Sequence, residues 1–189
     1  MINRYNSGAW LGNAIGNKAK NYLPDDCKKL IYDWVILDEV IKNNLEETSF
    51  YDWSFVLAPM YKAVESMLWK IATEIGLEKS DKILGNFFDE GNIEKNIDKI
   101  GERVRDKCKL PTIKNQLSEL KSFLKRYRHM PAHYGNKFNS YLEAEIAAKS
   151  ALHNMKCLIN DLVDDGLIKL PVIAQQREPD TINLDEIPF

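Results

Sequence analysis

Arg128 and His133 are the residues of this chain whose types and spacing most clearly suggest chemistry. They lie five positions apart in the segment Arg-His-Met-Pro-Ala-His. Arginine is always charged and presents a planar fork of donors that fits phosphate oxygens. Histidine titrates near neutrality, so it can take or give a proton. A fixed cation beside a proton carrier can cleave RNA without a metal, because RNA supplies its own nucleophile, the 2′-hydroxyl.

Pro131 indicates that one helix ends and another begins between these two residues. Proline lacks an N–H and clashes inside a helix, but it suits a first turn. We therefore expect Arg128 to end one helix and His133 to lie in the first turn of the next, with both side chains facing one concave junction. The spacing alone also fits an ordinary helix end. Arg128 would then pair with Glu143 or Glu145, and His133 would be a buried histidine bonded to a backbone carbonyl.

The segment resembles the R-(polar)-x-x-x-H signature of the HEPN superfamily, small all-α domains of which many are metal-independent ribonucleases in toxin–antitoxin and antiviral systems. Residues 59–68 are similar to the helix of the RNase LS toxin family that carries a basic residue and a glutamate three apart, here Lys62 and Glu65. The HEPN resemblance covers about residues 48–166. It implies that His133 is the general acid or base and that Arg128 holds the phosphate.

Lys62 and Glu65 join the predicted catalytic residues only through the resemblance to the RNase LS toxins. A partly buried Glu65 beside Arg128 would orient that arginine or act as a second proton carrier. The alternative is an exposed pair on one helix face, worth about 0.3–0.5 kcal/mol.

Four further residues near the motif are candidates for binding the RNA backbone. Lys121 and Lys125 lie seven and three positions before Arg128, so they share its helix face, and Arg126 is beside them. His129 would point about 100° away from Arg128 on a helix, at a position where the HEPN pattern has a variable polar residue. Basic residues of this kind also commonly belong to the solvated face of a helix.

Composition indicates a globular protein of one domain with a sizeable core. The chain has 189 residues, of which 44% are hydrophobic and 29% charged. Its formal net charge is −2 and its pI about 6.0. A protein that binds nucleic acid through a broad electrostatic surface is usually basic. Any RNA contact is therefore expected to be local, and a genomic DNA binder is disfavoured.

The three cysteines, Cys27, Cys108 and Cys157, show no CxxC and no Cys/His cluster with zinc spacing. We expect each to be a small apolar residue on a helix in a reducing cytosol, and we expect neither a metal nor a cofactor. No segment approaches the ~18 consecutive apolar residues of a membrane span. Residues 1–22 lack the apolar core of a signal peptide, so we place the protein in the cytoplasm.

Hydrophobic periodicity predicts an all-α fold, a HEPN-type helical bundle with a short extended or β tail. We divide the chain into an N-terminal arm with the first helix (1–47), a helical domain (48–166) and a tail (167–189). The glycines and asparagines of 1–23 favour turns, so a loosely ordered arm is expected there. Helices are expected at 24–44, at 51–75 with a kink or split at Pro59, near 80–88 and 92–107, from Pro111 to the motif, and at 139–165. The inward row of the last helix is expected to be Leu142, Ile146, Ala147, Ala151, Met155, Leu158 and Leu162.

The sequence thus predicts an endoribonuclease of HEPN type, the toxin of a toxin–antitoxin or antiphage defence system. The resemblance implies a homodimer whose two motifs face one groove, products with a 2′,3′-cyclic phosphate and a 5′-hydroxyl, and a protein antitoxin. Two alternatives stay open. One is a non-catalytic HEPN-like module that binds a nucleotide or a partner protein, and the other is a helical interaction protein with a chance motif.

Overall fold

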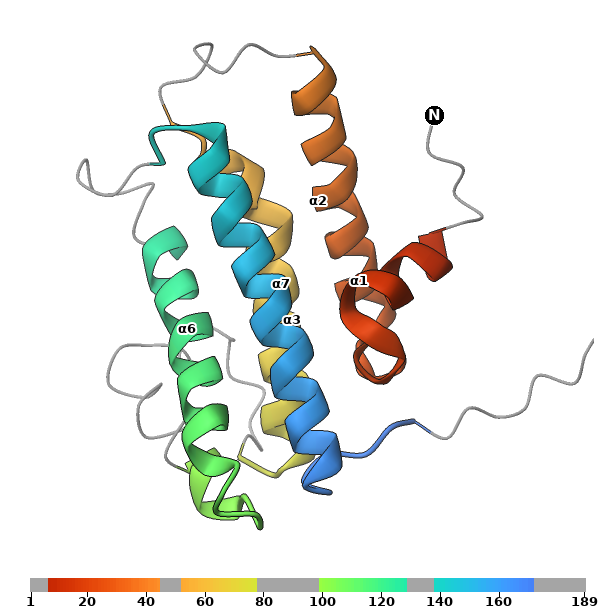
Figure 1. Cartoon of the computed structure of the whole chain (residues 1–189), viewed down its shortest axis with the longest axis vertical. Helices are drawn as coiled ribbons and strands as arrows, with labels where there is room; N and C mark the ends of the chain where they lie inside the picture. The colour runs from red at the N-terminus through yellow and green to blue at the C-terminus, as the bar shows by residue number, and fades with distance from the viewer. Residues whose placement is uncertain (1–6, 45–51, 78–98, 129–137, 172–189) are drawn as a thin grey trace, which may run out of the picture.

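The computed structural model describes residues 7–44, 52–77, 99–128 and 138–171, and every element with defined bounds in these ranges is a helix. The all-α prediction is confirmed. Four long helices, α2 (Asp25–Asn44), α3 (Ala58–Glu74), α6 (Leu110–Arg128) and α7 (Tyr141–Asp164), lie side by side and alternate in direction (Figure 1). Within the described ranges, no helix is long and apolar enough to cross a membrane.

The alternating directions bring matching helix termini together at each end of the bundle. α2 and α6 end, and α3 and α7 begin, at the upper end in Figure 1. We call this the motif end, because α6 terminates there at Arg128. The other end, where α2 and α6 begin and α3 and α7 finish, is called the opposite end.

Helices α2 and α3 follow the expected boundaries closely. The expected helix at 51–75 is split at Pro59: a turn of 3-10 helix, η3 (Ser54–Leu57), precedes α3, and the proline lies in the first turn of α3. Its missing N–H would have no intrahelical partner in that turn. Gly76 has a φ of +70° just after α3, a left-handed conformation that favours glycine at a helix end.

The expected loose arm is wrong for residues Ser7–Tyr22, which form helix α1. Leu11, Ile15 and Ala19 recur every four residues and are buried, because α1 packs against α7 and α2. Burial of this apolar face outweighs the low helix propensity of the glycines. Gly16, with φ +78° and ψ 158°, interrupts the helix in its middle.

The region before α6 is less helical than expected where it is described. Residues 99–103 are helical, but the chain leaves the helix at Val104 and turns through 107–109 into α6, so the helix expected near 92–107 ends early. The helix expected near 80–88 lies outside the described residues. The turn is held by the buried carboxylate of Asp165, which accepts hydrogen bonds from the backbone N–H groups of Arg105 (3.0 Å) and Asp106 (2.7 Å).

Helix α6 begins as predicted, with Pro111 in its first turn. Its buried face repeats at helical spacing through Ile113, Leu117, Leu120 and Leu124. Helix α7 begins with Ser140 as its N-cap, whose hydroxyl accepts from the N–H of Glu143 at 3.2 Å.

The inward face of α7 differs from the expected one at its first two turns. Leu142 and Ile146 are exposed, at 57% and 58% of their surface, whereas Ala144, Ala148 and Glu145 are buried. The predicted residues from Ala151 onward, Met155, Leu158 and Leu162, do face the core, and Ala147 is partly buried. Small alanines let α7 approach its neighbours closely, which turns the two larger side chains outward.

All three cysteines are free thiols. Cys27 is buried on α2 as expected, and burial raises the pKa of its thiol to about 12. Cys157 lies on α7 and is partly buried. Cys108 differs from the expectation, because it is exposed and lies in the turn before α6 rather than on a helix.

Candidate functional site

Arg128 is the last residue of α6, so the backbone ends a helix at the place that the motif requires. His129 and His133 lie outside the described residues. The chain is described again from Phe138, shortly before α7 begins at Tyr141. The motif therefore belongs to the connection between α6 and α7 at the motif end of the bundle.

The three basic residues that precede Arg128 occupy the last two turns of α6. Lys121 and Lys125 are half-buried, on the border of the helix face that carries Leu120 and Leu124 into the core. Arg126 is exposed, and its guanidinium carbon lies 4.2 Å from the centre of the Phe138 ring. A cation over an aromatic face at this distance is attracted to the ring. Arg126, one of the predicted RNA-binding residues, thus also contacts Phe138, where the chain is described again after the motif.

Phe138 is anchored by its backbone as well as by its ring. Its N–H donates to Asp52 Oδ1 at 3.3 Å, and its carbonyl accepts from the N–H of Trp53 at 3.1 Å. Asp52 also accepts from the backbone N–H and the hydroxyl of Ser54, both at 2.9 Å. Together with the contact from Arg126, these hydrogen bonds tie Phe138 to the residues at the start of η3.

Lys62 and Glu65 lie in the first half of α3, the half nearer the motif end. Lys62 is exposed, and Glu65 is half-buried and accepts a hydrogen bond from the hydroxyl of Tyr61 at 2.8 Å. The tyrosine orients the carboxylate from one turn earlier in the helix. Both residues thus share one end of the bundle with Arg128.

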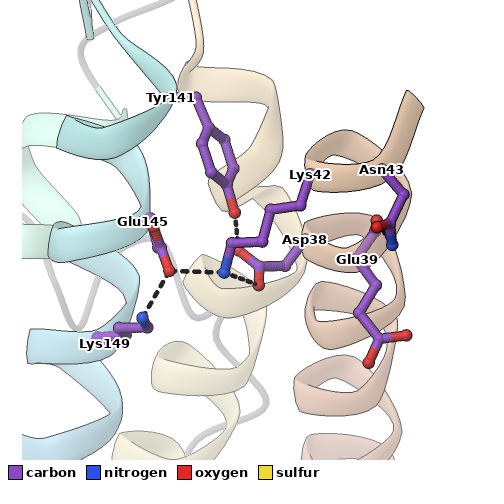
Figure 2. Close-up of polar contacts among 7 residues, drawn as sticks. All are labelled: Asp38, Glu39, Lys42, Asn43, Tyr141, Glu145 and Lys149. Atoms are coloured by element: carbon purple, nitrogen blue, oxygen red, sulfur yellow. Dashed lines mark hydrogen bonds and ion pairs between the residues drawn. The ribbon is translucent and has the colours of Figure 1, made fainter. Parts of the chain in front are cut away.

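A cluster of charged residues at the motif end was not foreseen from the sequence. Asp38 and Lys42 of α2 meet Tyr141, Glu145 and Lys149 of α7 (Figure 2). We call these five residues the α2–α7 ionic cluster. The ammonium of Lys42 lies 2.8 Å from Asp38 Oδ2 and 2.7 Å from Glu145 Oε1, and that of Lys149 lies 2.5 Å from the same Glu145 oxygen. The hydroxyl of Tyr141 donates to Asp38 Oδ1.

Three members of the α2–α7 ionic cluster have pKa values shifted by their contacts. Hydrogen bonds from Lys149 and Lys42 lower the pKa of Glu145, and hydrogen bonds to Asp38 and Glu145 raise the pKa of Lys42. Burial, with the hydrogen bond to Asp38, raises the pKa of Tyr141. These shifts keep Glu145 ionised and Lys42 and Tyr141 protonated near neutral pH, so the contacts among them clamp α2 to α7.

The sequence indicates only some of the contacts in the α2–α7 ionic cluster. Asp38 with Lys42, and Glu145 with Lys149, are spaced by four on their own helices, the spacing of intrahelical ion pairs. The link from Lys42 to Glu145 joins residues 103 positions apart, and no local pattern predicts it. Glu145, which the sequence offers as a partner for Arg128, is bound by Lys42 and Lys149.

Comparisons of the chain with protein-family models, curated proteins and solved structures found no significant match. The case for a function therefore rests on the residues of the chain and on the HEPN-like motif that they form.

Proposed function

We propose that this protein is a metal-independent endoribonuclease of HEPN type, acting as the cytoplasmic toxin of a toxin–antitoxin or antiphage defence system. The observation that carries the proposal is the end of α6 at Arg128. It puts the arginine at a helix terminus and the rest of the motif in the connection to α7, as expected for a cation and a histidine that share one junction.

In the proposed mechanism, His133 takes the proton of the 2′-hydroxyl or gives one to the leaving 5′-oxygen. Arg128 binds the scissile phosphate through two parallel hydrogen bonds and stabilises the charge that develops on it. Glu65, held by Tyr61 at 2.8 Å, orients the arginine or carries a second proton, and Lys62 adds positive charge. Lys121, Lys125, Arg126 and His129 contact the RNA backbone.

The α2–α7 ionic cluster supports this division of roles. Its two carboxylates and two ammonium groups neutralise one another, so the cluster adds no net charge to the surface proposed to bind RNA, which is formed by basic residues of α6 and α3. On a chain of net charge −2, this local concentration matters. We further propose that two chains dimerise with their motifs facing one groove, and that a protein antitoxin covers the groove.

The direct test is incubation of purified protein with total RNA in the presence of EDTA. We expect cleavage that leaves a 2′,3′-cyclic phosphate and a 5′-hydroxyl, the products of attack by the 2′-oxygen. His133→Ala is the matched control. Cleavage that needs Mg²⁺, or that leaves 3′-hydroxyl ends, would show that the mechanism is wrong.

A non-catalytic HEPN-like module that binds a nucleotide or a protein is the second candidate. The net charge of −2 favours it, because proteins that bind nucleic acid through a broad surface are usually basic. In the same experiment, saturable nucleotide binding without any cleavage product would favour the module over the enzyme.

A further inference from the structure

Helix α7 carries a pair of metal-ligating side chains that the proposed ribonuclease does not use. His153 and Cys157 are one helical turn apart, and Cys157 Sγ lies 3.5 Å from His153 Nε2. His153 is exposed and Cys157 half-buried, so an ion can reach both from solvent. We propose that this pair is a two-point binding site for a borderline or soft divalent cation such as Zn²⁺.

The separation of the two atoms fits tetrahedral coordination of zinc. Zinc binds a thiolate sulfur at about 2.3 Å and an imidazole nitrogen at about 2.0–2.1 Å, with an angle of about 109° between them, so the two ligand atoms are about 3.5 Å apart. The observed separation is 3.5 Å. The distance between the two ligand atoms therefore fits the ion. Spacing by four on a helix is also the spacing of the two histidines in helical zinc sites. The expectation of no metal rested on the absence of a CxxC and of a larger Cys/His cluster, and it passed over this pair.

The chain supplies two ligands to this site, and water completes the coordination shell. Asp161 lies one turn beyond Cys157, but its carboxylate accepts from Gln116 Nε2 at 2.8 Å. Among the described residues, no group of three His, Cys, Asp or Glu side chains could hold a metal. The site is therefore an open one, with positions that a solvent molecule or an external ligand can occupy.

Cys27 and Cys108 differ from Cys157 in their burial or in their position in the fold. Cys27 is buried, and its thiol donates to the carbonyl of Ala63 at 3.3 Å. Cys108 is exposed, but it lies in a turn, and the nearest histidine in the sequence is His129. Among the described residues, Cys157 is the one cysteine that combines access from solvent with an imidazole nitrogen at 3.5 Å.

Binding exchanges a proton for the metal. Thiols bind zinc as thiolates, so the ion replaces the thiol proton of Cys157, and one proton is released per ion bound. The site begins 12 residues after Tyr141, roughly 18 Å along the helix axis. It is therefore separate from the motif, and EDTA would empty it without affecting the proposed cleavage.

The test uses the full chain, reduced and free of metal, with Zn²⁺ alone in equilibrium dialysis. We expect one ion per chain for the original protein and for Cys108→Ser. Cys157→Ser and His153→Gln should each weaken binding at least roughly tenfold, because each removes one of two ligands. Circular dichroism should be unchanged, since neither side chain is in the core.

Two further measurements keep the proposal falsifiable if a variant folds poorly. Co²⁺ added to the original protein should give a thiolate-to-metal charge-transfer absorption. Calorimetry in buffers of different protonation enthalpy should show release of about one proton per Zn²⁺. The proposal is overturned if the original protein does not bind Zn²⁺, if Co²⁺ gives no thiolate band, or if Cys108→Ser loses as much affinity as Cys157→Ser.

Discussion

The buried carboxylates at the two ends of the helical bundle have different partners. At the opposite end, Asp165 accepts hydrogen bonds from the backbone N–H groups of Arg105 and Asp106. At the motif end, Asp38 and Glu145 bind the ammonium group of Lys42, a side chain.

This difference separates a turn held by backbone contacts from two helices held by side-chain contacts. A carboxylate that accepts from backbone N–H groups fixes a turn, and losing it leaves those N–H groups without this partner. In the α2–α7 ionic cluster, Lys42 has two carboxylate partners, so the loss of one leaves the other. The motif, its basic residues and the Lys62–Glu65 pair all lie at the motif end.

The largest expected effect is loss of activity from substitutions at the motif end. His133→Ala should lower RNA cleavage by roughly 10²-fold or more, the contribution of a general acid or base. Arg128→Ala should do likewise, and Arg128→Lys should not restore full activity, because lysine lacks the bidentate fork. Thermal unfolding and circular dichroism would verify that the variants fold. An inactive variant that is also unfolded would give no support to the catalytic roles.

Substitutions should lower the free energy of unfolding more at the opposite end than at the motif end, the reverse of their expected effect on activity. Asp165→Asn replaces one carboxylate oxygen, a hydrogen-bond acceptor, by an amide nitrogen, a donor, beside the N–H groups of Arg105 and Asp106. This change should lower the free energy of unfolding by about 1.5–3 kcal/mol. Glu145→Gln at the motif end should cost about 1 kcal/mol or less, because Lys42 keeps Asp38 as a partner. Urea denaturation followed by circular dichroism measures both. Equal losses for the two variants would contradict the contrast between the ends.

Lowering the pH should remove the contribution of Asp165 to the free energy of unfolding. Burial raises the pKa of this carboxyl, but the hydrogen bonds from Asp106 and Arg105 outweigh burial and lower it overall. A lowered folded-state pKa stabilises the protein above the ordinary value of about 3.9, and this stabilisation is lost as the pH falls through the folded-state pKa. The difference in unfolding free energy between the original protein and Asp165→Asn should thus be full near pH 7 and shrink below about pH 4. A difference independent of pH would show that the carboxylate charge does not matter.

The smallest expected effect concerns the oligomeric state: the mass in solution should be twice that of one chain. If two motif ends face each other, Arg128, His133 and the lysines of α6 are doubled along one cleft, which concentrates positive charge on an acidic chain. Light scattering at micromolar protein should then report about twice 21.8 kDa. A strictly monomeric protein that still cleaves RNA, or a dimer joined through its opposite ends, would rule this arrangement out.

The sequence predicted the long helices well, because their buried faces repeat with helical spacing and their ends carry proline or glycine. Pro59, Pro111 and Gly76 mark the boundaries of α3 and α6 by local backbone chemistry. The start of α7 was misjudged because burial there follows tertiary contacts. Glu145 is buried since two lysines neutralise it, while the larger Ile146 beside it is exposed.

Helix α1 and the candidate site mark the limits of prediction from local patterns. The glycines of α1 favoured the prediction of a loose arm, yet its apolar face is covered mainly by α7, which is distant in the sequence. At the site, the helix end at Arg128 followed from Pro131 and the motif. The anchoring of Phe138 by Asp52 and Trp53 joins residues 86 positions apart, so no local pattern indicates it.

The docking of α1 on α7 has a consequence for synthesis of the protein on the ribosome. Lys18 of α1 pairs with Asp164 of α7, 146 residues later in the chain. Translation at about 5–20 residues per second leaves roughly 7–30 s between the two. During that interval Leu11, Ile15 and Ala19 lack the α7 surface that covers them in the finished fold. A nascent chain of this protein therefore exposes an apolar helix face that a chaperone can bind until α7 emerges.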